Sequence, residues 1–155
     1  MTDSIPLFKF AGTPYEIGLA HGRALKEPIR EFLATVTVVH RANNAHLTVD
    51  RESLTAFCMR NRGFLEEFSP ELMQEMRGIA DGADLDLESI VYLNTFLELE
   101  DLRAPNLGGR ILPDALWGCT TFNVTADTTT GNRAYLGQTF DMEKYYQKFL
   151  VLLEI

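Results

Sequence analysis

The sequence predicts an α+β fold in which a helical segment comes first and the strands of a sheet follow it. Apolar residues recur at helical spacing from residue 17 to about residue 100. That period fails over residues 104–113, where prolines and glycines mark a loop. The segments beyond this loop are rich in Thr, Val and Phe, which is typical of strands. The chain has 155 residues, of which 46% are hydrophobic, so it is long enough for one domain with a packed core.

The first helix is expected to begin at Thr13. Thr13 can cap the helix, Pro14 suits its first position, and Glu16 can complete a capping box. Pro28 should kink or restart the helix, because proline lacks the N–H that the helical ladder needs.

Three more helices are expected before the loop. The pair Asn43-Asn44 interrupts the pattern, and a second helix follows from about residue 50 to residue 68. Ser69 opens a third helix that Gly82 should stop, and Asp86 caps a fourth that runs to about residue 100. The apolar face of the third helix is expected to consist of Leu72, Met76, Ile79 and Ala80.

Strands are expected at residues 7–10, 120–126, 133–140 and 148–155, with a turn at 127–132. The chain ends within the last of these strands, which would leave an unpaired apolar edge. We therefore expect this sequence to be the N-terminal portion of a longer protein, whose further strands cover that edge.

The composition argues against several classes of function. A net charge of −8 argues against a nucleic-acid partner, because phosphate binding needs clustered Lys and Arg. Without a secretory signal or a membrane-spanning apolar run in the sequence, we expect a cytoplasmic protein with no membrane partner. The two cysteines, Cys58 and Cys119, make no disulfide framework, and Cys58 lies in an apolar helical stretch that suits a buried thiol. We expect no metal and no bound cofactor.

The pair Gly118-Cys119, between the loop and the next strand, is a candidate for chemistry. The thiolate of Cys119 can attack the Gly118 carbonyl, and water can then release the upstream piece. Cys119 would become an N-terminal residue whose α-amine, with a pKa of roughly 7.7 to 8, can accept the thiol proton. By composition alone, the same pair is also typical of a turn followed by a packed cysteine.

The expected hairpin brings a carboxylate towards this cysteine. With a turn centred near Thr130, the numbers of opposing residues sum to about 260, which places roughly Asp141 opposite Cys119 unless a bulge shifts the register. Asp141 could orient the new amine or hold a cationic group of a substrate. Thr120 and Thr121 could donate hydrogen bonds at the cleavage site, although threonine also simply favours strands.

Several ordered motifs resemble those of a known family. They are residues 12–18 with His21-Gly22, then 76–83, 88–91 with 93–95, 118–121 and 137–141. On these residues the chain resembles the acyl-coenzyme A:6-aminopenicillanic acid acyltransferases, or isopenicillin N acyltransferases, which are autoproteolytic N-terminal nucleophile hydrolases. The last two segments match the catalytic signatures. Where members of the family often have Asn and Trp, this sequence has Thr139 and Phe140.

The resemblance implies a four-layer αββα N-terminal-nucleophile sandwich, of which this chain covers the helical segment and the first strands. It implies cleavage between Gly118 and Cys119, with residues 1–118 as the helical pro-segment and 119–155 as the start of a truncated catalytic chain. Cys119 would be the nucleophile, and Asp141 would be the aspartate close to it. The oxyanion-hole asparagine would lie beyond Ile155.

The implied reaction is acyl transfer or hydrolysis of an amide (C–N, non-peptide) bond through a Cys119 thioester. Its partners would be a small-molecule amide or acyl donor and the two cleaved fragments, held together as a heterodimer. Acyl-coenzyme A could serve as a substrate, although the sequence holds no glycine-rich phosphate loop or basic cluster.

Two other functions fit the residues. A conventional cysteine–histidine hydrolase would pair Cys119 with His21, but His21 shares a helical stripe with apolar residues, which favours packing. Alternatively, the helical segment is an interaction or regulatory module and Cys119 is a buried structural thiol. Tyr145 and Tyr146 are candidates for a pocket entrance, and Trp117 could gate the site or pack against the loop.

Overall fold

The computed structural model describes residues 5–43, 62–101, 119–139 and 144–155, together with residues 52, 56, 59, 60 and 141. In chain order its elements are β1 (Leu7–Lys9), α1 (Pro14–Ala24), α2 (Lys26–Asn43), α4 (Arg62–Phe68), α5 (Pro70–Ala83), α6 (Leu87–Asp101), β2 (Thr121–Val124), η2 (Ala126–Thr128), β3 (Tyr135–Gln138), η3 (Lys144–Phe149) and β4 (Leu152–Glu154). Here η denotes a 3₁₀ helix.

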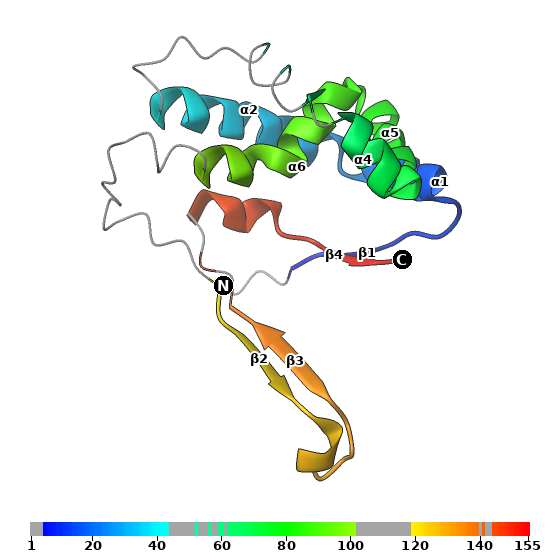
Figure 1. Ribbon diagram of the computed structural model, residues 1–155, viewed down its shortest axis with the longest axis vertical. Coiled ribbons are helices and arrows are strands. Elements are labelled where there is room, and N and C mark those ends of the chain that lie inside the picture. The colour runs from blue at the N-terminus through cyan, green and yellow to red at the C-terminus, as the bar shows by residue number, and fades with distance from the viewer. Residues whose placement is uncertain are drawn as a thin grey trace.

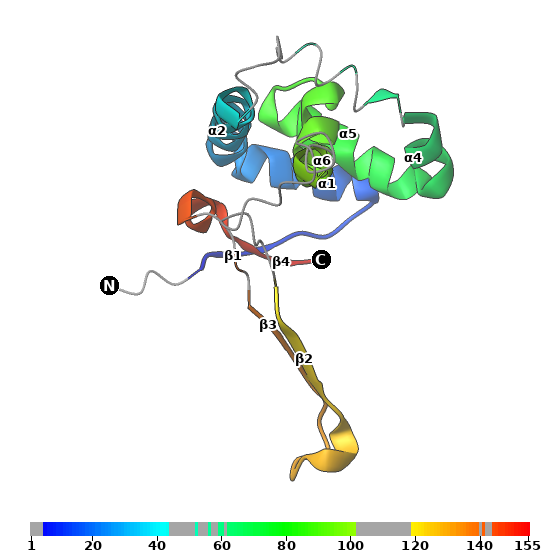
Figure 2. The ribbon, with the colours of Figure 1, turned by 60° about the vertical axis from the view of Figure 1, so that its left-hand side comes forward.

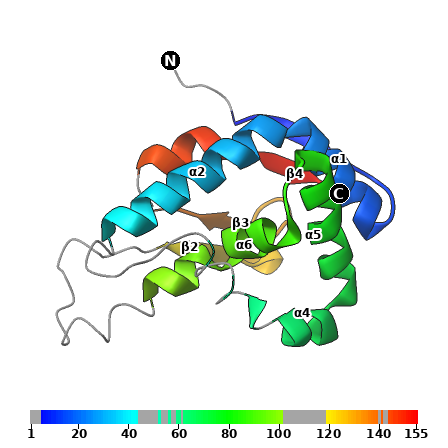
Figure 3. The same cartoon turned by 90° about the horizontal axis from the view of Figure 1, so that it is seen from above.

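The helices form one layer, which lies over η3 and the small sheet of β1 and β4 (Figure 1). The hairpin of β2 and β3 projects away from this layer, with η2 at its far tip (Figure 2). Seen from above, α6 lies between α2 and α5 (Figure 3). The root of the hairpin therefore faces the rest of the structure, and its tip lies far from the helices (Figures 1 and 2).

Local sequence signals set the boundary between α1 and α2. The Thr13 hydroxyl accepts the Glu16 N–H at 3.4 Å, and the Glu16 carboxylate accepts the Thr13 N–H at 2.8 Å. This capping box confirms the predicted helix start, and the bond from the Thr13 N–H holds the pKa of Glu16 below its ordinary value. The chain restarts as α2 at Lys26, with Pro28 in the first turn, where a missing N–H breaks no helical bond.

Glycines bring α1 and α5 into direct backbone contact. Gly18 and Gly22 of α1 meet Gly78 and Gly82 of α5. A Cβ atom at Gly18 would lie 2.0 Å from the carbonyl oxygen of Glu75, so no larger residue fits without moving a helix. Gly82 is therefore a packing residue and not the predicted stop signal.

The end of α5 is set instead by Asp84 and by two cationic side chains of α2. Asp84 adopts left-handed dihedrals (φ 51°, ψ 52°), which few residues other than glycine, asparagine and aspartate tolerate. Arg30 donates to the carbonyl oxygens of Ala83 and Asp84 at 3.5 and 3.3 Å. Lys26 pairs with the Asp84 carboxylate, and this bond lowers the pKa of Asp84. These contacts satisfy carbonyls that the helix end leaves free.

The buried face of α5 differs from the predicted one by a rotation. Leu72, predicted to be buried, is 54% exposed, whereas Met73 is 1% exposed. The glycine contact with α1 sets the rotation of α5 about its axis, and this rotation turns Met73 inwards. Ala80, also predicted on this face, is buried.

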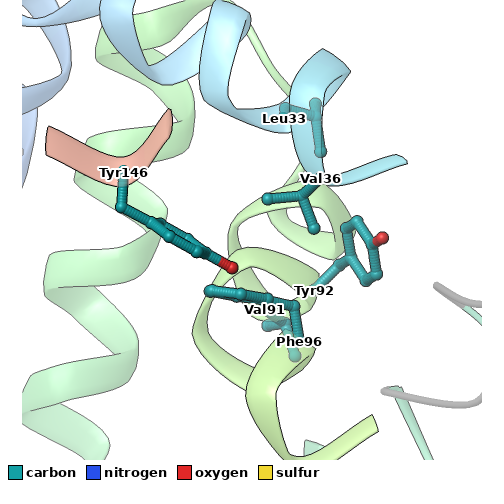
Figure 4. Close-up of a cluster of buried hydrophobic side chains, with 6 residues drawn as sticks. All are labelled: Leu33, Val36, Val91, Tyr92, Phe96 and Tyr146. Atoms are coloured by element: carbon teal, nitrogen blue, oxygen red, sulfur yellow. The ribbon is translucent and has the colours of Figure 1, made fainter. Parts of the chain in front are cut away.

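The main hydrophobic cluster joins α2, α6 and η3 (Figure 4). Its buried members are Leu33, Val36, Val91, Tyr92, Phe96 and Tyr146. The Tyr146 ring extends from η3 into this cluster, stacks on Phe96 with ring centroids 5.9 Å apart, and meets Phe32 edge-on at 5.8 Å. These contacts hold η3 against the underside of the helical layer.

The strands are shorter than predicted, and one prediction is wrong in part. Residues 144–149 form the 3₁₀ helix η3, so only Leu152–Glu154 of the predicted strand at 148–155 is extended. The reason is aromatic burial, because Tyr146 and Phe149 both contact Phe32 of α2. β4 pairs in parallel with β1, and β2 pairs antiparallel with β3. Of the helix predicted over residues 50–68, α4 is described, and most of the rest lies outside the described residues. The predicted loop at 104–113, Cys58, Trp117 and Gly118 also lie outside them.

Candidate active site

Cys119 lies at the root of the hairpin, two residues before β2 begins. Its thiol is free and exposed. A nucleophile must be reachable by its substrate, so this exposure suits a reactive cysteine and contradicts the alternative in which Cys119 is a buried structural thiol. Gly118, the other half of the predicted cleavage site, lies outside the described residues.

The hairpin register agrees with the approximate predicted one to within one residue. Thr121 pairs with Gln138, whereas the predicted register would pair it with Thr139. Hydrogen bonds between Thr120 and Thr139 continue this register towards Cys119. Asp141 still lies at the same end of the hairpin as Cys119, but its link to that strand runs through other residues.

That link is the hydroxyl group of Thr139. The Thr120 N–H donates to Thr139 Oγ1 at 3.0 Å, and the Thr139 hydroxyl donates to Asp141 Oδ2 at 3.2 Å. The Thr139 N–H also donates to the Thr120 carbonyl oxygen at 2.9 Å. Thr139 thus holds both backbone groups of the residue that follows Cys119, and it binds the carboxylate of Asp141.

The sequence predicts site roles for Thr120, Thr121 and Asp141 and none for Thr139. For Thr120, the contacts to Thr139 run through its backbone groups. Thr121 begins β2 and is exposed. A signal for Thr139 is present in the sequence, because Thr139 and Asp141 are two residues apart and so share one face of a strand.

An apolar face leads along the hairpin to this network. Phe122, Val124 and Tyr135 lie on that face and are 58%, 37% and 53% exposed. Opposite Phe122 stands Gly137, where a Cβ atom would lie 2.2 Å from the Phe122 ring. Because Gly137 has no side chain, the Phe122 ring can pack over it across the strand pair.

His21 and Tyr146 are packing residues. His21 stacks on Phe10, with ring centroids 5.8 Å apart and planes 15° apart, and burial lowers its pKa, which favours the neutral imidazole. The predicted packing role of His21 is confirmed. Tyr146 is 6% exposed within the main cluster, so its predicted place at a pocket entrance is wrong. Tyr145 stacks on Tyr146 with ring centroids 4.3 Å apart.

Within the described ranges, no group of three or more His, Cys, Asp or Glu residues is arranged to hold a metal ion. None of the helices in the described part of the chain combines the length and the apolar character needed to cross a membrane.

Comparison with known proteins finds similarity to part of a longer protein. No family model matches the chain. The chain is 29% identical over 144 residues to the 40 kDa form of acyl-coenzyme A:6-aminopenicillanic-acid-acyltransferase from Emericella nidulans. The aligned region covers 93% of this chain and 36% of that protein, so the chain spans about a third of its relative's length.

Proposed function

We propose that this chain is part of a self-cleaving cysteine N-terminal nucleophile enzyme that transfers acyl groups or hydrolyses amides. The observation that carries the proposal is the exposed thiol of Cys119, next to a network in which Thr139 joins Thr120 to Asp141. Similarity over nearly the whole chain to a protein named as an acyltransferase supports the same reaction class.

Maturation begins when the Cys119 thiolate attacks the carbonyl carbon of Gly118. The C–N bond between the two residues breaks, the Cys119 nitrogen takes a proton, and a thioester joins Gly118 to the sulfur. Water then adds to the thioester carbon and leaves a carboxylate on Gly118 and a thiol on Cys119. The products are residues 1–118 and a chain that starts at Cys119.

In turnover, the new α-amine accepts the thiol proton, and the thiolate attacks the carbonyl of a small-molecule amide or acyl donor. The leaving group departs with a proton from that amine, and the acyl group remains on sulfur as a thioester. An acceptor amine or water then takes the acyl group and restores the thiol. Acyl-coenzyme A is a candidate acyl donor, because the name of the relative includes it.

Asp141 has a role at the new chain end. Its carboxylate is held at the root of the hairpin through Thr139, which itself binds the residue after the nucleophile. A fixed carboxylate there stabilises a protonated α-amine and orients it towards the sulfur. A cysteine–histidine mechanism has less support, because His21 is stacked on Phe10 and its pKa is lowered.

The overall architecture proposed is the four-layer αββα sandwich. The helical layer would be one outer layer, and the two strand pairs would contribute to the inner sheets. The two cleavage products would then form one enzyme as a heterodimer.

The test is to measure the intact mass and the N-terminal sequences of the purified protein. We expect the wild type to yield a chain that begins at Cys119, and we expect Cys119→Ala to remain a single chain. Acyl transfer by Cys119→Ala should fall by more than about a thousandfold, because the nucleophile itself is lost.

The other cysteine of the sequence supplies a matched control. Cys58→Ala should be cleaved at the wild-type rate, which separates a specific need for Cys119 from a general effect of losing a thiol. A fully active wild type that stays in one piece would contradict self-cleavage and favour a conventional thiol hydrolase.

A further inference from the structure

We infer that Thr139 is a positioning residue that aligns Asp141 with the backbone next to the nucleophile, an inference that rests on the proposed function of Cys119. The Thr139 side chain joins two groups that are remote in the sequence, and both belong to the site. It accepts from the Thr120 N–H at 3.0 Å and donates to Asp141 Oδ2 at 3.2 Å.

The direction of these bonds follows from the chemistry of a hydroxyl group. A hydroxyl has one hydrogen to donate and two lone pairs that accept. The Thr120 N–H can only donate, so it occupies a lone pair of Thr139 Oγ1. The single hydrogen then remains for the Asp141 carboxylate, which can only accept when it is ionised. The three groups therefore form one chain of hydrogen bonds, which runs from the amide to the carboxylate.

Cleavage makes this network more important. Before cleavage, Cys119 is held by peptide bonds on both sides. Once the bond to Gly118 is cut, Cys119 is a chain end, and the first hydrogen-bonded residue after it is Thr120. Thr120 is held by two bonds to Thr139, one to the Thr139 hydroxyl and one from the Thr139 N–H. Loss of the hydroxyl should therefore impair turnover more than it impairs cleavage.

Two variants separate the hydroxyl group from the shape of the side chain. Thr139→Val keeps the β-branched shape and the backbone N–H but removes the hydroxyl. Thr139→Ser keeps the hydroxyl and removes the methyl group. Both variants should be compared with wild type by thermal unfolding, so that any effect on folding is measured separately.

The natural substrate is not identified, so para-nitrophenyl acetate serves as the acyl donor. Two measurements monitor the acylation of Cys119. They are the release of nitrophenolate and the increase in the mass of the chain. We expect Thr139→Val to lower the maximal rate about tenfold with little change in KM, as loss of a hydrogen bond to a charged group predicts. Thr139→Ser should stay within about threefold of wild type, because the bond to Asp141 is kept.

Self-cleavage is a second readout that needs no substrate, and it should be slowed less than acylation in Thr139→Val. Equal losses in the Val and Ser variants, or no loss in either, would overturn the inference. If these preparations still show cleavage that depends on Cys119, the proposed function stands even though the inference about Thr139 fails. If Cys119→Ala is cleaved like wild type, the proposed function fails instead, whatever the Thr139 variants do.

Discussion

At the scale of single residues, His21 makes the stability of the fold depend on pH. Its ring packs on Phe10, and burial holds its pKa below the ordinary value of 6.5. In the unfolded chain the imidazole titrates near that ordinary value. As the pH falls from about 6.5 towards the folded pKa, the unfolded state binds a proton that the folded state does not, so stability decreases.

Replacing His21 with Gln should reduce this loss, because glutamine does not titrate. Urea unfolding of wild type and His21→Gln at about pH 7.5 and about pH 5.5 measures the effect. Wild type should lose more stability between the two pH values than the variant does. Glu16 and Asp84 do not interfere with this measurement. Their pKa values lie below the ordinary values of 4.5 and 3.8, so their contribution to folding stability is lost only at lower pH. Identical losses in both proteins would exclude His21 as the titrating group.

The residues that could be predicted from the sequence are those whose partners are close along the chain. Thr13 and Glu16 form their capping box within one turn of helix, and the Asp86 carboxylate accepts the Ser89 N–H at 2.7 Å in the same way. Local patterns therefore predict these residues. The bond from Thr120 to Thr139 spans 19 positions and depends on the hairpin register, which a shift of one residue changes. This is why the bond between Thr120 and Thr139 could not be predicted from the sequence.

At the scale of helices, the contact between α1 and α5 has little tolerance for added volume. A Cβ atom at Gly78 would lie 2.2 Å from the Tyr15 carbonyl oxygen, and one at Gly18 would lie 2.0 Å from that of Glu75. Both obstacles are backbone atoms, which cannot turn aside as a side chain can. Any substitution must therefore separate the two helices or bend one of them.

We expect Gly78→Ala to lower the free energy of unfolding by about 3 kcal/mol, as overpacking of a close contact predicts. Gly63→Ala in α4 is the matched control, because nothing lies within 4 Å of a Cβ atom there. That control should be neutral or should raise stability by about 0.5–1 kcal/mol, since alanine favours helix over glycine. Urea unfolding measures both. Similar values for the two variants would show that the predicted clash is relieved at little cost.

The sequence predicts where helices begin better than it predicts how they are rotated or what replaces a strand. The start of α5 follows from the Ser69 hydroxyl, which accepts the Leu72 N–H at 3.3 Å. The rotation of α5 follows from its contact with α1, so Met73 is buried where Leu72 was expected. In the same way, η3 forms because Tyr146 finds a site between Phe32 and Phe96. Contacts with residues distant in the sequence decide both outcomes, and a local sequence pattern does not reveal those contacts.

At the scale of the whole molecule, the proposed cut would fall between two parts that are packed together. β1 lies before the cut and β4 lies after it, and they pair in parallel from Leu7 and Leu152 onwards. Lys9 forms an ion pair with Glu154 at 2.7 Å across this ladder. The Phe10 N–H donates to the Glu154 carbonyl oxygen at 2.9 Å. The two parts therefore share backbone hydrogen bonds that cleavage at Gly118 would leave in place.

The aromatic contact between η3 and the helical layer should contribute most to this association. Tyr146 lies after the cut, whereas Phe32 and Phe96 lie before it. We expect the cleaved wild-type fragments to elute together in size-exclusion chromatography.

Tyr146→Ala should weaken the association by about 3–5 kcal/mol, because it removes a buried aromatic ring, and the fragments should separate on dilution. Tyr146→Phe, which keeps the ring, should hold the fragments together far better than Tyr146→Ala does. Fragments that stay together equally well in both variants would place the association in the β1–β4 ladder and not in the aromatic cluster.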